Sequence, residues 1–249
     1  MDAYTSFARV YDTFMDNVPY EEWGQYLMSL LKEYQIDDGV VVDLGCGTGA
    51  VTEILAKAGY DMIGIDISED MLNVAMEKKE ASGLDILYLL QDMCEVELYS
   101  SANAFVSICD SVNYITEPDD LVSCFQNLSR YLEENGVIIF DFNTEHKYRD
   151  IIGDTTIAEH REKCSFIWDN YYYEEERINE YELNLFIQEE KDPSLYRKFS
   201  EKHYQKAYTL SEMTDIICRS GLTLEHAYDA FTHEPATKSS ERIYMIAKK

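Results

Sequence analysis

The residues with the clearest chemical potential lie where apolar stretches of the chain end. In VVVDLGCGTGAV (Val40 to Val51), an apolar run reaches Asp43 and is followed by Gly45, Gly47 and Gly49. A glycine-rich turn that opens a helix lets unpaired backbone N–H groups face a ligand. The sequence therefore predicts a ligand-binding loop here, with Cys46 contributing only its backbone.

Two further carboxylates end the next two apolar stretches. Asp66 closes GID, at a distance from the loop where a carboxylate can accept both hydroxyls of a ribose. Asp92 closes LLQD, with Met93 beside it as an apolar contact for an adenine edge. We also assign Ile67 and Met71, which follow Asp66, to the predicted cofactor site.

The charges around the loop help to separate two ligand classes. The glycines also fit the G-x-G-x-x-A pattern of dinucleotide-binding enzymes, with Ala50 in the last position. A carboxylate such as Asp43 is unfavourable next to a pyrophosphate but favourable next to an ammonium or sulfonium group. Three acids without a basic residue among them therefore favour S-adenosylmethionine, and a nicotinamide cofactor remains the alternative. Asp43 could instead cap the turn that follows it.

The polar residues after the fourth apolar stretch are candidates for catalysis. Asp110, Asn113 and Tyr114 follow AFVSIC, at the edge of the sheet where ligands bind in such folds. Asp110 and Asn113 are expected to hold either a second substrate or the amino group of the S-adenosylmethionine. His203 is a candidate base. A polar turn and a solvated histidine are the respective alternatives.

Alternation of apolar runs with helical patterns predicts an α/β fold. Each strand is apolar nearly throughout, which is typical of a parallel sheet covered on both faces. Ser68 and the T-x-x-E pattern of Thr209 to Glu212 predict helix starts. The expected strands are 40–45, 61–67, 86–92, 104–111, 137–143, 222–231 and 242–249, and the expected helices are 50–59, 69–83, 119–136 and 209–221.

One segment interrupts this alternation. Residues 144–207 contain aromatic, alternating, strand-like runs with turns predicted near 177–179 and 192–194. We interpret them as an antiparallel β insertion within a single domain of residues 1–249, which serves as a lid and acceptor pocket. The acidic run 174–176 is predicted to be a solvated turn.

Composition and charge narrow the range of partners. The chain has 249 residues, 46% of them hydrophobic, and a formal net charge of −27. Such a charge opposes binding to nucleic-acid phosphates, so no nucleic-acid partner is expected. The six cysteines show no C-x-x-C pair, which predicts reduced thiols and no metal site. Without a signal-like start or a long apolar run, we expect a soluble, cytoplasmic monomer or homodimer without membrane contact.

Taken together, the motifs VVDLGCGTG, GIDIS, QDM, CDSVNYI and GVIIFDFN resemble those of class I S-adenosylmethionine-dependent methyltransferases. The chain is most similar to the small-molecule branch that includes aminosugar N-methyltransferases and glycine N-methyltransferase. These share an N-terminal pattern like YTSFARVYDTFMDNVPYEEW. The resemblance implies a Rossmann-like, seven-stranded, mostly parallel sheet with an antiparallel last strand.

The same resemblance assigns residues 1–39 to a helical cover over the cofactor. Tyr11 and Trp23, with Tyr4 and Tyr20, would then close over the sulfonium by cation–π attraction. The alternative is that Tyr11 and Trp23 form the apolar face of an N-terminal helix.

The implied activity is methyl transfer to a small polar molecule. In-line displacement at a sulfonium carbon depends mainly on alignment and exclusion of water, so the lack of an evident catalytic triad is no objection. Three alternatives remain open: a nicotinamide-dependent oxidoreductase, a non-catalytic protein that binds S-adenosylmethionine, and an RNA methyltransferase.

Overall fold

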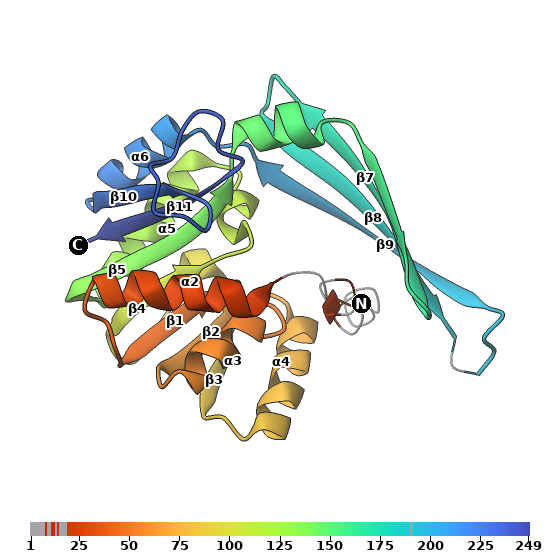
Figure 1. The fold of residues 1–249 in the computed structure, drawn as a ribbon, viewed down its shortest axis with the longest axis horizontal. Helices are drawn as coiled ribbons and strands as arrows, with labels where there is room; N and C mark the ends of the chain where they lie inside the picture. Colours follow the sequence, from red (N-terminus) through yellow and green to blue (C-terminus); the bar gives the residue numbers. More distant parts are fainter. Residues whose placement is uncertain (1–7, 9–10, 13, 15–18, 190) are drawn as a thin grey trace.

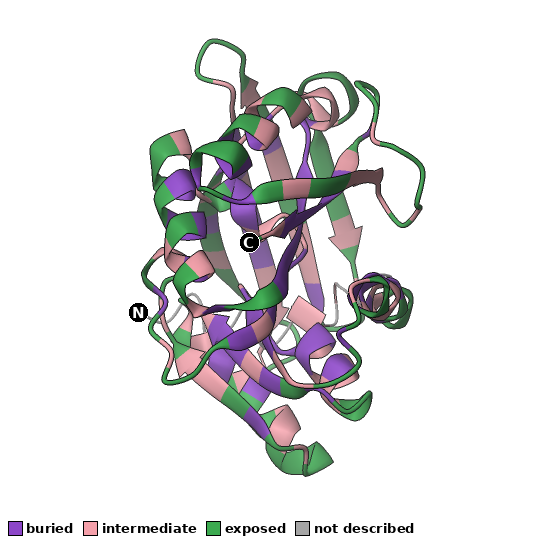
Figure 2. Cartoon of the chain, turned by 90° about the vertical axis from the view of Figure 1, so that its left-hand side faces the viewer, coloured by how far each residue is buried: buried purple, intermediate pink, exposed green. Residues whose placement is uncertain are grey.

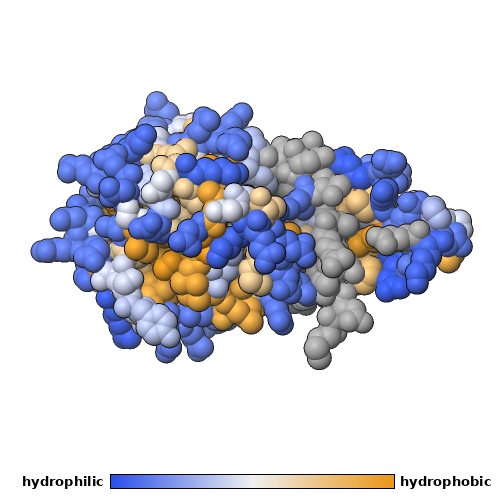
Figure 3. Space-filling model, turned by 90° about the horizontal axis from the view of Figure 1, so that it is seen from below, coloured by the Kyte–Doolittle hydropathy of each residue, from blue (hydrophilic) through white to orange (hydrophobic). Residues whose placement is uncertain are grey.

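Two sheets organise the chain. The computed structural model describes residues 8, 11, 12, 14, 19–189 and 191–249. A four-stranded sheet projects from a main body that is built on a seven-stranded sheet (Figure 1). Hydrophilic residues cover most of the face seen from below, with an apolar area on the main body (Figure 3). No helix in this part of the chain combines the length and apolar character needed to cross a membrane.

The main sheet contains seven strands, β1 (Val40–Leu44), β2 (Asp61–Asp66), β3 (Ile86–Leu90), β4 (Ala102–Ser107), β5 (Leu132–Asn143), β10 (Thr223–Asp229) and β11 (Arg242–Lys248). Their order is β10-β11-β5-β4-β1-β2-β3. Strands β1 to β5 pair in parallel, and β11 runs antiparallel to both β5 and β10. The predicted mostly parallel sheet with an antiparallel last strand is confirmed.

The central strands, such as β5, are buried on both faces, since successive side chains point to opposite sides of the sheet and helices cover each side. On β5, Ile138, Phe140 and Phe142 join one core cluster, whereas Val137 and Ile139 join the other. Buried residues follow the strands and the inner sides of the helices (Figure 2). This explains why the strand sequences read as continuous apolar runs rather than as alternating ones.

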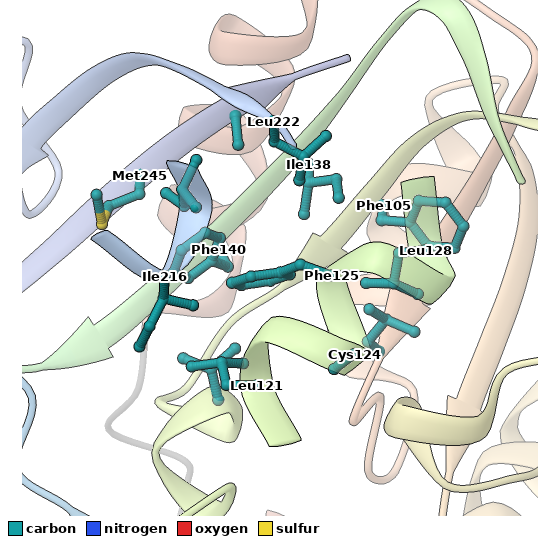
Figure 4. Close-up of a cluster of buried hydrophobic side chains, with 14 of the residues drawn as sticks. Phe105, Leu121, Cys124, Phe125, Leu128, Ile138, Phe140, Ile216, Leu222 and Met245 are labelled. Carbon is teal, nitrogen blue, oxygen red and sulfur yellow. The ribbon is translucent and has the colours of Figure 1, made fainter. Parts of the chain in front are cut away.

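The covering layers contain the helices α2 (Tyr20–Glu33), α3 (Ala50–Lys57), α4 (Glu69–Ser82), α5 (Pro118–Tyr131) and α6 (Leu210–Arg219). Helices α2 and α3 share one core cluster with the sheet, and α5 and α6 share the other. In the cluster under α5 and α6, Phe125 of α5 packs on Phe140 of β5, with ring centres 4.9 Å apart (Figure 4). Burying such a side chain contributes about 1.5–3 kcal/mol.

The predicted helix starts are confirmed by their hydrogen bonds. Ser68 caps α4 by accepting a hydrogen bond from the Met71 N–H, and the left-handed Gly83 ends that helix. Thr209 and Glu212 form a reciprocal capping box at the start of α6.

The predicted end of α5 near residue 136 is wrong. The helix ends at Tyr131, and Leu132 already has extended backbone angles as the first residue of β5. Leu132 pairs with Ala102 of β4, so sheet formation takes precedence over the helical spacing. Gly136 is needed for close packing instead, since a Cβ there would lie 2.8 Å from the Asn103 carbonyl oxygen.

The projecting sheet consists of β6 (Thr156–His160), β7 (Cys164–Tyr173), β8 (Ile178–Gln188) and β9 (Tyr196–Lys206), preceded by the π-helical segment η4 (Lys147–Ile152). All its pairings are antiparallel, which confirms the predicted β insertion. The turn between β7 and β8 lies at 174–177, slightly earlier than predicted, and its glutamates are exposed. Arg177 at this turn forms an ion pair of 2.5 Å with Glu212 of α6.

Candidate functional site

The glycine loop joins β1 to α3, as predicted. Gly45, Gly47 and Gly49 all have positive φ angles, of 69°, 54° and 76°, in the left-handed region that favours glycine. A Cβ at Gly45 would lie 2.7 Å from Ser111 Oγ, so the loop packs closely against the segment after β4. Among the described residues, a Cβ at Gly47 would meet no atom within 4 Å. The space beside Gly47 is therefore open to a ligand that approaches the backbone.

Asp66 holds this loop in position at the end of β2. Its carboxylate accepts hydrogen bonds of 2.8 Å from the N–H groups of Gly47 and Ser68. Burial raises the pKa of Asp66, while the N–H groups of Ser68 and Gly47 act in the opposite direction. The next side chain, Ile67, is exposed by 72%, and Met71 is buried in α4. A carboxylate and an apolar side chain thus lie side by side at the predicted ribose position.

Asp43 lies beneath the loop and is almost fully buried, with 2% of its surface exposed. Thr52 Oγ1, in the first turn of α3, donates a hydrogen bond of 2.6 Å to Asp43 Oδ2. Burial raises the pKa of Asp43 to about 6; the Thr52 hydrogen bond lowers it and the charge of Asp66 raises it. The Thr52 contact fits the alternative in which Asp43 stabilises the following turn, and its contact with a cationic ligand stays a prediction.

The segment after β3 reaches the same edge of the sheet. Asp92 caps the short helix η2 (Met93–Glu95) by accepting a hydrogen bond of 2.8 Å from the Cys94 N–H. The Met93 methyl carbon would lie 3.4 Å from a Cβ at Gly45, so this side chain borders the glycine loop. Burial raises the pKa of the Cys46 thiol well above its usual value, which agrees with a role for its backbone only.

Asp110 belongs to a buried charge network that sequence reasoning missed. Its carboxylate accepts hydrogen bonds of 2.6 Å from both Arg242 Nη2 and Gln205 Nε2. Arg242 Nη1 also donates to Asp141 Oδ2 at 2.7 Å. Asp141 in turn accepts from the N–H groups of Cys109 and Asp110, both of which have positive φ angles. We call Asp110, Asp141, Gln205 and Arg242 the Arg242 network.

The Arg242 network joins four parts of the chain at one edge of the sheet: the turn after β4 and strands β5, β9 and β11. Burial alone would lower the pKa of Arg242, but the carboxylates of Asp141 and Asp110 outweigh it and raise that pKa. The Asp110 carboxylate is already paired with Arg242. A cofactor or acceptor that also contacts Asp110 would therefore share this carboxylate with Arg242. That contact stays a prediction.

Asn113 is fully buried and its side-chain amide is hydrogen-bonded within the chain. Its Nδ2 donates to the carbonyl oxygens of Asn143 and Lys206, at 2.9 and 2.8 Å, and its Oδ1 accepts from the Asn143 N–H at 3.0 Å. The residue thereby fixes β5 and β9 to the turn after β4. These contacts favour a structural role over the predicted contact with the acceptor, which stays a prediction.

Tyr114 and His203 do come together, at the junction of the two sheets. The Tyr114 hydroxyl is hydrogen-bonded to the Tyr181 hydroxyl and lies 3.3 Å from His203 Nδ1. The Tyr181 ring stacks between His203, at a centroid distance of 4.5 Å, and Trp168, at 4.2 Å. Burial raises the pKa of Tyr181 well above its usual value, so its hydroxyl keeps its proton. The second His203 nitrogen, Nε2, lies 3.2 Å from Glu201 Oε2.

These side chains define the inward face of the four-stranded sheet, the face in contact with the main body. Strand pairing places Trp168, Leu183 and Glu201 in one row and Asn170, Tyr181 and His203 in the next. Alternation along the strands made this face readable in principle. The sequence alone does not give the register of the paired strands, however, so of these residues it points only to His203.

Aromatic residues from the N-terminal part border the same edge. Burial raises the pKa of Tyr11 well above its usual value, with Cys109 and the hydrogen-bonded Tyr20 nearby. Trp23 stacks on Phe231 with ring centres 5.3 Å apart, and the Arg242 guanidinium lies 5.7 Å from the Trp23 ring centre. Trp23 thus has partners within the chain, and the closure of Tyr11 and Trp23 over a sulfonium stays a prediction. Tyr4 lies outside the described residues.

Asp12 connects the N-terminal part to the glycine loop. Thr48 Oγ1 donates a hydrogen bond of 2.7 Å to Asp12 Oδ1, and Lys78 Nζ of α4 forms an ion pair of 2.5 Å with Asp12 Oδ2. Two residues further on, Phe14 packs edge-on against Phe166 of β7 at 4.9 Å. This short stretch therefore contacts both the loop and the inward face.

Comparison with known proteins assigns the family. The family described as "Methyltransferase domain" matches residues 41–136. A provisionally named methyltransferase of Geobacillus sp. (strain WCH70) is 33% identical over 99% of both chains. The crystal structure of a S-adenosylmethionine-dependent methyltransferase from Clostridium acetobutylicum ATCC 824 is similar over 98% of both chains, with 26% identity and a TM-score of 0.87. This chain belongs to the S-adenosylmethionine-dependent methyltransferases.

The solved sugar N-methyltransferase KedS8 from Streptoalloteichus sp ATCC 53650 shares the fold of this methyltransferase. Its TM-score is 0.77 at 16% identity, over 96% of this chain and 93% of that one. The family assignment confirms the resemblance stated from the motifs and sets aside the nicotinamide alternative. It identifies the enzyme as a transferase with S-adenosylmethionine as methyl donor.

The site of the methyltransferase fits this donor. The open space beside Gly47 admits a ligand, and the carboxylates of Asp43, Asp66 and Asp92 have hydroxyl or N–H partners rather than cationic ones among the described residues. A sheet edge that carries these three carboxylates favours a ligand with positive charge and ribose hydroxyls. In the same part of the chain, no group of three or more His, Cys, Asp or Glu side chains is arranged to hold a metal ion.

Proposed function

We propose that this methyltransferase methylates a small polar molecule bound between the carboxyl edge of the main sheet and the inward face of the four-stranded sheet. The main support for this proposal is that Tyr114, from the segment after β4, contacts Tyr181 and His203 of the inward face. Gln205 and Asp110 make a second polar link across the same junction. Polar and aromatic groups from both sheets thus face one region beside the glycine loop.

The residues of the main sheet would hold the cofactor, which when bound supplies an electrophilic methyl group on a sulfonium. Asp66 has oxygen lone pairs beyond those used by Gly47 and Ser68, and these would accept the ribose hydroxyls. Asp92 and Met93 would border the adenine. Asp43 would lower the energy of the positively charged end through the loop.

The remaining contribution of the protein would be alignment. Methyl transfer gains much of its rate from holding the reacting atoms about 3–3.5 Å apart and in line. The junction is suited to this because its polar side chains are fixed by hydrogen bonds, as with Asn113 and the Arg242 network. Residues 144–207 would act as the lid and acceptor pocket, and residues 1–39 as the cofactor cover.

Two facts favour a small acceptor over RNA. The formal net charge of −27 opposes association with a phosphate backbone. The fold also accommodates small acceptors elsewhere, since KedS8 is named a sugar N-methyltransferase. At 16% identity this relative supports the size class of the acceptor and leaves its chemistry open.

The proposal is tested by following a labelled methyl group. The enzyme and S-adenosylmethionine with a tritiated methyl group are incubated with a bacterial extract that has been separated into small molecules, RNA and protein. We expect label in the small-molecule fraction. Label confined to the RNA or protein fraction would contradict the proposal.

Two variants locate the acceptor. Trp168→Ala should reduce labelling by tenfold or more while the dissociation constant for S-adenosylmethionine stays unchanged, because Trp168 lies on the inward face beside Tyr181. Tyr171→Ala, on the opposite face of β7 and exposed, is the matched control and should label as the wild type does. Equal activity of all three proteins would place the acceptor elsewhere.

A further inference from the structure

The main sheet loses its cover toward the edge formed by β3, on the face that α5 and α6 cover elsewhere. Strand pairing places four side chains of this face in one row, Phe105, Val42, Ile63 and Leu87. Phe105 and Val42 are fully buried, Ile63 is partly exposed, and Leu87 is 50% exposed. Burial thus decreases from strand to strand toward β3.

The short connection between β3 and β4 accounts for this gap. Parallel strands are usually joined by a crossover that carries a helix and covers the sheet. Residues 91–101 are all described and contain only the three-residue η2, whose Met93 carbonyl oxygen lies 3.3 Å from Cys124 Sγ of α5. The connection therefore packs beside α5 and leaves the β3 edge open. Strand β3 lies at the lower end of the main body in Figure 1, and the view from below shows an apolar area on that body (Figure 3).

Three neighbouring apolar side chains form the open part of the sheet. Leu89 lies two residues after Leu87 on the same face, and Ile63 is the cross-strand partner of Leu87. Ile63 and Leu89 pack on the core but are only partly buried. We call Ile63, Leu87 and Leu89 the β3 face. A single exposed leucine is ordinary on a protein surface, whereas adjoining exposed apolar side chains indicate an interaction site.

Exposed carboxylates border the β3 face at both ends. Asp61 begins β2 and Asp85 directly precedes β3, and the register of the two strands makes them neighbours on this same face. At the other end, two hydrogen bonds with Gln91, which directly follows β3, hold Glu97 in place. None of these three acids has an ion-pair partner among the described residues. The border therefore concentrates unpaired negative charge around an apolar surface.

This combination fits a partner with apolar and basic side chains. A second copy of the chain would bring further acids, since its formal net charge is −27. Nucleic acids and anionic membrane surfaces would be repelled for the same reason. A protein helix with an apolar stripe flanked by Lys or Arg side chains would instead cover Leu87 and neutralise the border.

We propose that the β3 face is the docking surface for a basic amphipathic helix of a partner protein. This helix would occupy the place that a crossover helix after β3 would otherwise fill. From Asp85 to Gln91 there are 91 − 85 = 6 residue steps, about 20 Å of strand, which a helix spans in about 13 residues. The basic residues should therefore lie near both ends of the apolar stripe, about 13 residues apart. The inference is independent of the methyl acceptor.

A display selection on the full-length enzyme tests the proposal. The probes are helical peptides of about 18 residues, five turns, randomised over apolar, acidic, basic and neutral polar side chains. Peptides that bind the wild type are kept, and those that also bind Leu87→Asp are removed. We expect the surviving peptides to share an apolar stripe with Lys or Arg side chains near both of its ends.

Two variants and a control then assign the binding site of a labelled survivor by fluorescence anisotropy. Leu87→Asp should raise its dissociation constant at least tenfold. Asp61→Asn combined with Asp85→Asn keeps the apolar surface, so it should also weaken binding and reduce the dependence on salt. Leu195→Asp is the matched control, because Leu195 is 56% exposed in the turn between β8 and β9 and should bind as the wild type does. All variants should retain the unfolding temperature and the affinity for S-adenosylmethionine.

Several results would overturn the inference. A selection without survivors would do so, and so would survivors that are acidic or uncharged. Survivors that bind the Asp61 and Asp85 double variant as tightly as the wild type would show that the border carboxylates take no part. The double variant also decides the matter if Leu87→Asp lowers the unfolding temperature, because it alters only exposed groups.

Discussion

Replacing Asp43 by Asn should make the ligand-free enzyme more stable at neutral pH and weaken its hold on S-adenosylmethionine. Asp43 is 2% exposed, and burial raises its pKa from 3.8 to about 6. A difference of about two pH units corresponds to about 3 kcal/mol by which the folded state disfavours the ionised form. Asn retains an oxygen for the Thr52 hydroxyl but adds a buried N–H₂ group that costs about 1–2 kcal/mol. The net gain should be about 1–2 kcal/mol.

The pH dependence gives the sign of this effect. Because the folded-state pKa of Asp43 exceeds the unfolded one, the bound proton stabilises the folded wild type fully below pH ~4, and this stability is lost as the pH rises through about 6. The asparagine side chain of the variant does not titrate. The advantage of Asp43→Asn should therefore be present at pH 8 and decrease between pH 6 and 4.

Thermal unfolding at pH 8 and pH 5 measures the difference. A gain of 1–2 kcal/mol corresponds to roughly 2–8 °C for a chain of this size. Asp85→Asn, at an exposed position, is the control and should leave the unfolding temperature unchanged. Titration should show the affinity for S-adenosylmethionine reduced about tenfold. A variant that is less stable than the wild type at pH 8, or equally shifted at both pH values, would refute the reasoning.

Two ion pairs, those of Arg242 and Lys78, give predictions that differ in the expected loss of stability. Arg242→Ala leaves the buried Asp141 carboxylate and the partly exposed Asp110 carboxylate without their guanidinium partner. The free energy of unfolding in urea denaturation should therefore fall by about 3–5 kcal/mol. A loss below about 1 kcal/mol would show that the Asp141 charge is not buried in solution. Lys78→Ala breaks a partly exposed ion pair with Asp12 and should lower the free energy of unfolding by at most about 1 kcal/mol. Because Asp12 also contacts the glycine loop, the same variant should bind S-adenosylmethionine more weakly in a titration. Unchanged affinity would separate Asp12 from cofactor binding.

The main sheet could be predicted because its signals are local. The strands between 40 and 143 contain compact apolar runs, although β5 begins with the polar stretch LEENG, and glycines or caps such as Ser68 mark several element ends. The edge residues follow from this, since parallel strands place their carboxyl ends together. The end of α5 was mispredicted because pairing of Leu132 with Ala102, 30 residues earlier in the chain, overrides helical spacing.

The contacts at the junction of the two sheets could not be predicted from local sequence patterns. Arg242 and Gln205 meet Asp110 across 132 and 95 residues of sequence, and neither lies in a motif. The inward face depends on the register of three antiparallel strands, and a shift by one residue would exchange Glu201 with its outer-face neighbours. An arginine that opens an apolar last strand is the one signal that could have pointed to the Arg242 network.

Titration of S-adenosylmethionine into the wild type and into Asp66→Asn tests the placement of the cofactor most directly. Asn keeps the size of the side chain but only one acceptor oxygen, so it can accept from the Gly47 N–H or the Ser68 N–H and not from both; the unfolding temperature without ligand shows whether the loop remains folded. The account predicts one binding site in the wild type and an affinity at least tenfold lower in the variant. Equal affinity for both proteins would contradict the placement of the adenosyl ribose at Asp66.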